Sequence, residues 1–212
     1  LALIVSLAVV AGTVAVLAPI AAAAPAAPCR VTNLKTGTIY DGTGPNLQRA
    51  IDLAAARTTL RVRGTCVGTF TIGRSITLIG WPTAAYPNPT LDGDAAGRVL
   101  TVRAGSVSLS HLLITDGAAP AGAGGGGISN YGTLTLRGST SVSGNVAGDR
   151  GGGILSSHGS LVMNGASTVS GNVALHSLGG GGLVDRGRFS MNGNASVSGN
   201  TVIAAPFQIV SP

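Results

Sequence analysis

The stretch from Gly125 to Asn200 repeats one pattern three times. The first copy reads GGGI (125–128), YGTLTLRG (131–138) and VSGN (142–145). The second reads GGGI (151–154), HGSLVMNG (158–165) and VSGN (169–172), and the third reads GGGL (180–183), RGRFSMNG (186–193) and VSGN (197–200). The VSGN blocks begin at 142, 169 and 197, so they are 27 and 28 residues apart. A fixed period of this length indicates stacked structural repeats.

Within each copy, apolar residues alternate with small polar ones, which is typical of short strands with one buried face. Glycines separate the strands and suit the sharp corners between them. Three strands and three corners in each repeat predict an all-β fold, a right-handed parallel β-helix with about 27 residues per coil. A propeller or sandwich would need antiparallel hairpins, and the repeats lack their two-residue turns. The predicted interior columns are Ile128/Ile154/Leu183, Leu134/Leu161/Phe189, Leu136/Met163/Met191 and Val142/Val169/Val197.

The composition agrees with a solenoid. The 212 residues are 44% hydrophobic but only 3% aromatic, and 34 of them are glycine. A solenoid can build its core by stacking small branched side chains in layers. The formal net charge of +6 comes from 13 scattered basic residues. Without a dense basic patch, nucleic acid is not an expected partner.

Residues 1–24 are uncharged and almost wholly apolar, and small residues follow them. This segment predicts a secretory signal peptide, with an uncleaved membrane anchor as the alternative. After cleavage no membrane-bound part is expected, so the protein would be secreted or held at the cell surface. Cys29 and Cys66 are the only cysteines. In an exported chain they favour one disulfide, two free thiols being the alternative, and neither has metal-ligand spacing.

Residues 25–44 are expected to be a lead-in, and residues 45–205 the β-helix. A helix over Pro45–Ala56 has one apolar face, which we expect to cap the first open layer. We expect Leu60–Val62, Phe70–Ile72 and Ile76–Ile79 to form the first coil. Two further segments leave the strand pattern: a proline-rich excursion over residues 81–89 and a flexible insertion over residues 118–124.

After Asn200 the pattern fades, and residues 206–212 are assigned as a C-terminal tail. An uncovered last coil would leave strand edges free to pair. Three arrangements would cover those edges: further coils of a longer solenoid, the tail folding over them, or a second molecule. The sequence does not decide among these, so the oligomeric state stays open.

The order of cap helix, Leu60–Val62, Phe70–Ile72 and Ser75–Gly80 resembles the start of pectate-lyase-like β-helix proteins. The GGGI and VSGN blocks resemble polymorphic outer membrane protein repeats, although Val142, Val169 and Val197 stand where those repeats carry Phe. The first resemblance implies a fold that hosts polysaccharide lyases and hydrolases. The second implies a surface adhesin, although no residues remain for the membrane barrel of that family.

Catalysis on a polysaccharide would need paired carboxylates, or carboxylates holding Ca²⁺ beside a basic residue. The chain has no Glu, and its best candidates are Asp92, Asp94 and Asp116, with His111 one corner upstream. Asp92 and Asp116 each begin an Asp-Gly step on coils expected to be neighbours, and could stack about one strand spacing apart. The alternative interpretation is turn chemistry, for which Asp-Gly is typical.

A second candidate site is the corner column Tyr131/His158/Arg186, beside Asn130/Ser157/Asp185. An aromatic ring, an imidazole and a guanidinium in a row could hold a sugar or an acidic ligand, although a solvated corner tolerates the same residues. Asn145, Asn172 and Asn200 form a third column. Because Asn ladders in stacked sheets bond to the backbone and to each other, we interpret this column as structural.

The preferred hypothesis is an exported, non-catalytic β-helix repeat protein with a surface, adhesive or glycan-binding role. Its partner would be a polysaccharide or cell-surface glycan, and it would need no cofactor or metal. The alternative is a lyase or glycoside hydrolase of the pectate-lyase-like fold, which uses Asp92, Asp94 and Asp116. Ca²⁺ would be a cofactor only in that alternative.

Overall fold

The computed structural model describes residues 9–10, 13–14, 28–41, 45–84, 86–176 and 179–203. The expected signal peptide and the C-terminal tail lie almost wholly outside these residues. The exception is an antiparallel pair of two-residue strands, β1 (Val9–Val10) and β2 (Thr13–Val14). In the described part of the chain, no helix has both the length and the apolar character needed to cross a membrane.

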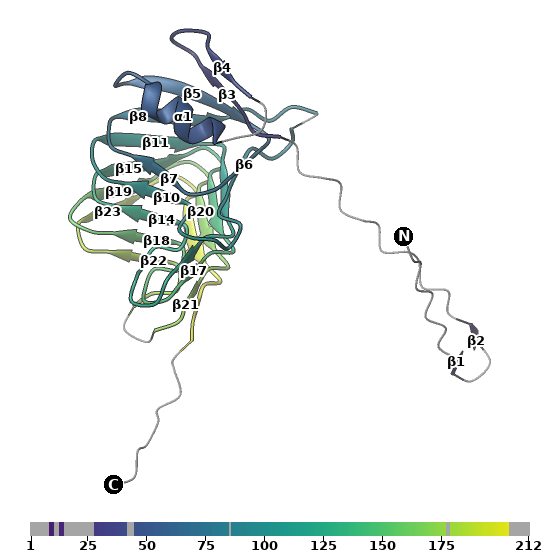
Figure 1. The fold of residues 1–212 in the computed structure, drawn as a ribbon. Helices are drawn as coiled ribbons and strands as arrows, with labels where there is room; N and C mark the ends of the chain where they lie inside the picture. The colour runs from purple at the N-terminus through teal and green to yellow at the C-terminus, as the bar shows by residue number, and fades with distance from the viewer. Residues whose placement is uncertain are drawn as a thin grey trace.

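The rest of the described chain is a parallel β-helix of about five turns, as the repeat period predicts (Figure 1). The first sheet along the chain has eight strands. Six of them are parallel: β5 (Thr58–Arg63), β8 (Ile76–Gly80), β11 (Ser106–Ser110), β15 (Thr133–Arg137), β19 (Ser160–Met163) and β23 (Arg188–Met191). Two antiparallel strands, β3 (Arg30–Asn33) and β4 (Ile39–Tyr40), extend it beyond β5.

Two further parallel sheets complete the predicted walls. The six-stranded sheet contains β6 (Thr65–Val67), β9 (Thr90–Asp92), β12 (Leu113–Thr115), β16 (Ser141–Ser143), β20 (Thr168–Ser170) and β24 (Ser196–Ser198). The five-stranded sheet contains β7 (Phe70–Ile72), β10 (Leu100–Val102), β14 (Ile128–Asn130), β18 (Ile154–Ser156) and β22 (Leu183–Asp185).

A fourth wall departs from the triangular coil predicted from the sequence. Four short strands pair in parallel: β13 (Ala118–Ala119), β17 (Val146–Ala147), β21 (Val173–Ala174) and β25 (Thr201–Val202). The last three each follow an asparagine corner, and β13 follows Asp116-Gly117. Ala147 and Ala174 are buried in this sheet, so a two-residue segment still contributes one inward side chain per coil. Ala118 and Ala119 therefore belong to a strand and not to the flexible insertion expected there.

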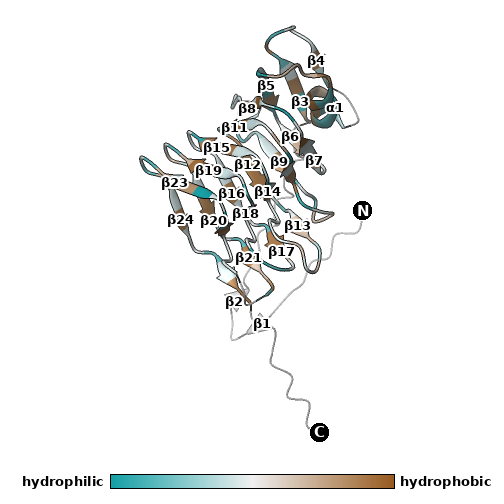
Figure 2. Cartoon of the chain, turned by 90° about the vertical axis from the view of Figure 1, so that its left-hand side faces the viewer, coloured by the Kyte–Doolittle hydropathy of each residue, from teal (hydrophilic) through white to brown (hydrophobic). Residues whose placement is uncertain are grey.

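The four predicted interior columns are confirmed by the strand register. Leu134 pairs with Leu161, and Leu161 with Phe189. The other three columns align in the same way, and most of their side chains are fully buried. Figure 2 shows the result as apolar colour repeated along stacked strands, with hydrophilic colour at the loops between them. In the last described coil, Phe189 is 42% exposed because no described coil lies beyond it.

The first coil differs from the expected one. Leu60 pairs with Leu78, so Ile76–Gly80 already begins the second coil, and the first consists of β5, β6 and β7. The sequence analysis overlooked β6, a three-residue strand with one buried side chain, Cys66.

The one helix in the described part of the chain, α1 (Asn46–Leu53), lies across the first coil, as Figure 1 shows. It is shorter than the predicted span because Ala54 takes an extended backbone conformation. Leu47, Ala50 and Ile51 are buried against the core, as a cap requires. On the other face, Gln48 accepts a hydrogen bond from the Thr71 backbone N–H at 2.8 Å, which fixes the helix to β7.

Cys29 and Cys66 form a disulfide, as predicted. It joins the residue before β3 to the middle of β6, across 37 residues of chain. We expect the native protein to offer no alkylatable thiol, and its intact mass to rise by two hydrogens on reduction. Mass spectrometry after alkylation, with and without reductant, checks this, and two modified thiols in the unreduced protein would contradict it.

Candidate functional site

The three candidate carboxylates lie at strand ends and in a turn: Asp92 ends β9, Asp94 lies in the turn that follows, and Asp116 directly follows β12. Asp92 is in register with Thr115, so Asp116 lies one ladder position further along and does not stack on Asp92. Asp92 Oδ1 accepts a hydrogen bond from the Asp94 backbone N–H at 2.8 Å. Asp94 and Asp116 both have positive φ, at 50° and 51°, a conformation that Asp adopts more readily than most residues. These contacts are those of turn chemistry.

His111 is not brought to these carboxylates. It precedes β12, whereas Asp116 follows β12, so the strand separates the two side chains. His111 Nδ1 instead lies 3.1 Å from Ser139 Oγ, at a hollow of about 250 Å³ that Pro87 and Pro89 also line. Within the residues that the structure describes, no three His, Cys or Asp side chains are grouped so that they could hold a metal ion.

The three residues of the predicted corner column lie in one groove. Tyr131, His158 and Arg186 line one open groove of about 840 Å³, between the five-stranded and eight-stranded sheets. The sequence analysis missed two more arginines in the same groove, Arg103 and Arg188. Arg103 could have been found, because it lies 28 residues before Tyr131 and so occupies the same corner one coil earlier. Among the residues that the structure describes, no acidic side chain lines the groove.

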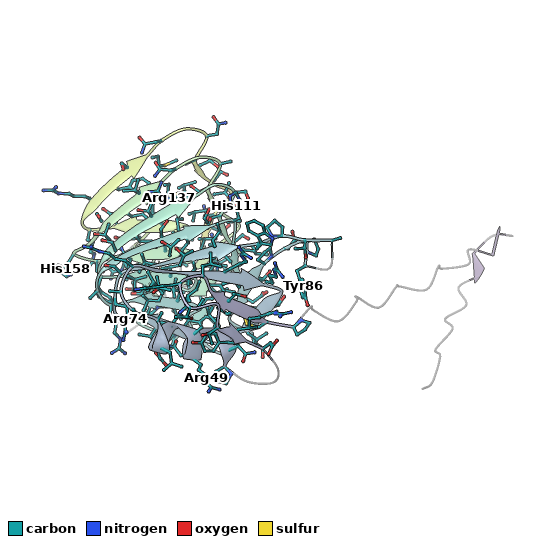
Figure 3. All side chains as sticks on the ribbon, turned by 90° about the horizontal axis from the view of Figure 1, so that it is seen from above. Arg49, Arg74, Tyr86, His111, Arg137 and His158 are labelled. Carbon is teal, nitrogen blue, oxygen red and sulfur yellow. A yellow bond between two sulfur atoms is a disulfide. The ribbon has the colours of Figure 1, made fainter. Side chains whose placement is uncertain are left out.

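The register at this corner differs from the predicted one. Asn130 pairs with Ser156, not with Ser157, and Ser156 pairs with Asp185. The corner between β18 and β19 holds one residue more than its neighbours, and His158 takes it up with a φ of 64°. Tyr131 therefore stacks on Ser157, and His158 projects beside them. Figure 3 shows His158 at one edge of the solenoid, well away from His111.

Glycines keep the floor of the groove bare. A Cβ on Gly132 would lie 2.6 Å from the Gly105 carbonyl oxygen, and one on Gly159 would collide with the carbonyl oxygen of Gly132. Because successive corners lie so close together, backbone atoms form the floor of the groove and the long side chains form its walls. The result is a shallow channel with cationic walls and one exposed aromatic ring, Tyr131, that is open to a ligand from solvent.

Arg98 supports the coil beneath Tyr131. Its Nε and Nη2 donate hydrogen bonds of 2.8 Å to the carbonyl oxygens of Gly125 and Gly124 on the next coil. Burial lowers the pKa of Arg98, and the electrostatic interaction with Tyr131 opposes that shift. With two carbonyl acceptors, this arginine has the contacts of a structural residue.

The asparagine column forms a hydrogen-bonded ladder. Asn145 and Asn172 are fully buried. Asn172 Oδ1 accepts from the Asn145 backbone N–H at 3.1 Å and from Asn145 Nδ2 at 2.9 Å. Asn200 Oδ1 accepts the equivalent bonds from Asn172, at 3.0 and 2.9 Å. Each of these side chains thus donates a hydrogen bond within its own corner and bonds to a neighbouring coil.

Comparison of the chain with protein-family models, curated proteins and solved structures gives no match. The resemblances to pectate-lyase-like proteins and to outer membrane protein repeats thus gain no support beyond the shared parallel β-helix architecture. The chain is a parallel β-solenoid, and the residues of the groove are the remaining evidence for what it binds.

Proposed function

We propose that this protein is an exported, non-catalytic β-helix that binds an acidic glycan along the corner groove. The observation that carries the proposal is the composition of the groove. Arg103, Arg186, Arg188 and His158 line the groove together with Tyr131, and no acidic residue of the described chain joins them. Guanidinium groups form paired, charge-assisted hydrogen bonds with carboxylates. An exposed tyrosine ring offers a flat apolar face for a sugar ring.

The groove also has a direction. The backbone ladder continues through the corner, since Tyr131 N–H bonds to Val102 O, Ser157 N–H to Asn130 O and Arg186 N–H to Ser156 O, each at 2.8 Å. Arg103 and Arg186 are therefore three ladder steps apart, roughly 14 Å along the solenoid axis. A linear ligand lying along that axis would place anionic groups at both ends and a sugar ring over Tyr131.

Two further observations support parts of the proposal. Hydrolysis of a glycoside normally requires a pair of carboxylates, and the lining offers none. The Cys29–Cys66 disulfide is in keeping with an oxidising compartment, and so with the export that residues 1–24 predict.

The test is binding of an oligogalacturonate, with a neutral glucan oligosaccharide of equal length as the comparison ligand. We expect Arg186→Ala to weaken binding about tenfold, the usual cost of a charge-assisted contact. Higher salt should weaken it further. Arg137→Ala is the matched control, because Arg137 is exposed on β15 outside the groove lining. Calorimetric titration of the wild type and both variants with each oligosaccharide gives the dissociation constants.

Equal affinity in Arg186→Ala and the wild type would contradict binding at this groove. Cleavage of the oligosaccharide, detected as new reducing ends and abolished by Asp116→Ala, would favour the lyase or hydrolase alternative instead.

A further inference from the structure

A second group of arginines lies near the capped end of the solenoid, away from the groove. We call Arg30, Arg61 and Arg63 the arginine cluster. Arg30 on β3 is directly opposite Arg63 on β5, and Arg61 is two residues from Arg63 on the same strand. Since directly opposed residues point to the same face of a sheet, all three side chains lie on the outer face, opposite the buried Val31 and Val62.

The cluster places like charges together with little compensation. Opposed like charges on neighbouring strands destabilise a sheet. Among the described residues, the cluster forms one ion pair, between Asp41 Oδ2 and Arg30 Nε at 3.8 Å, and both side chains are largely exposed, at 60% and 40%. Such an ion pair contributes little. In the part of the chain that the structure describes, neither Arg61 nor Arg63 forms an ion pair.

The arginines also have unused donors. The Nε atoms of Arg61 and Arg63 are buried and have no hydrogen-bond partner among the described residues. A buried N–H group without an acceptor is costly, and costlier still when charged. An oxyanion on the outer face would accept hydrogen bonds from the Nη atoms of these arginines and neutralise the repulsion between them at the same time.

Neighbouring contacts hold the cluster in place. The Cys29–Cys66 disulfide fixes the residue next to Arg30, and Pro28 bridges Thr65 beside it. The Arg61 guanidinium stacks over the Trp81 ring, 4.4 Å from its centroid, which leaves the edge of the guanidinium available for hydrogen bonds. The site therefore needs little rearrangement to accept a ligand.

We propose that the arginine cluster binds a phosphate or sulfate group. Three arginine side chains share one face of two adjacent strands, and a tetrahedral, multiply charged oxyanion offers enough oxygens to pair with all of them, whereas a carboxylate has only two. This site is distinct from the corner groove. The groove lies at the first residues of β11, β15, β19 and β23, and the cluster lies at the last residues of β5.

The test uses thermal unfolding of the full chain in sodium chloride, and in sodium phosphate or sodium sulfate at the same ionic strength. We expect phosphate at ten times its Kd to raise the Tm by roughly 3 to 6 °C. Arg63→Gln should have a higher Tm than the wild type in chloride, because the repulsion is relieved, and should lose the anion-specific rise. Arg137→Gln, exposed on β15 outside both the groove and the arginine cluster, should keep that rise.

These variants separate specific binding from the general stabilising action of phosphate and sulfate, which acts on every protein surface. An anion-dependent rise that is unchanged in Arg63→Gln would overturn the proposal. If Arg63→Gln does not fold, calorimetric titration of the wild type with inorganic phosphate decides, and the absence of saturable binding would overturn it. A rise in Tm with phosphate but not with sulfate, or the reverse, identifies which of the two anions the site prefers.

Discussion

Replacing Gly152 with valine is expected to cost more than about 3 kcal/mol of stability and to lower the Tm by roughly 10 °C or more. Gly152 is buried at the corner before β18, where the chain passes tightly between its neighbouring coils. Even a Cβ there would lie 2.5 Å from the Gly181 carbonyl oxygen and closer still to that of Val173. Both obstacles are backbone carbonyl oxygens, so neither can rotate away as the end of a flexible side chain could. Thermal and urea unfolding followed by circular dichroism measure the effect.

Gly73→Val is the matched control for this experiment. Gly73 is exposed, and a Cβ there would meet nothing within 4 Å. We expect this variant to unfold within a few degrees of the wild type. If the two variants unfolded at the same temperature, the close stacking of glycine corners would not be a determinant of stability.

Asn172→Ala is expected to destabilise the protein by about 3 kcal/mol. The substitution removes the acceptor of both the Asn145 backbone N–H and the Asn145 side-chain amide. It also removes the donor to the carbonyl oxygens of Val142 and Ser170, at 2.9 and 3.1 Å. Because Asn172 is fully buried, water does not replace these bonds freely. The loss of unfolding free energy is calculated from the midpoint of urea unfolding, with the dependence of that free energy on urea concentration held at the wild-type value.

The control is a second asparagine pair on the same solenoid. Asn192 Nδ2 donates to Asn164 Oδ1 at 2.9 Å, but this bond is exposed to solvent. Asn164→Ala should therefore cost less than about 1 kcal/mol. A loss in Asn172→Ala no larger than that in Asn164→Ala would show that burial of the ladder contributes nothing.

The sequence predicted the register of the repeats because three copies of one pattern define it redundantly. Leu134, Leu161 and Phe189 could be aligned by inspection, and the strands pair accordingly. The fourth sheet was missed because its strands, such as Val146–Ala147, are two residues long. A segment that short shows no alternation of apolar and polar residues, so it cannot be distinguished from a turn.

The candidate sites were predicted less completely, for reasons of geometry. Tyr131, His158 and Arg186 were correctly placed on one corner. The spacing of the blocks shows one extra residue at this corner, since Ile154 lies four residues before His158 but Ile128 only three before Tyr131. The prediction aligned His158 with Tyr131, whereas in the structure Ser157 is aligned with Tyr131. The arginine cluster could not be foreseen, since Arg30 and Arg63 meet through antiparallel pairing of β3 with β5, outside the repeat.

That extra residue shows how this architecture accommodates change in chain length. Between β18 and β19 the chain gains one residue, yet Leu161 still pairs with Leu134 on one side and Phe189 on the other. The additional residue is accommodated at His158, where φ is positive and the side chain is exposed. Insertions at this corner are thus uncoupled from the core, and a foreign peptide grafted between Ser157 and Gly159 would be displayed on a scaffold whose folding it does not disturb.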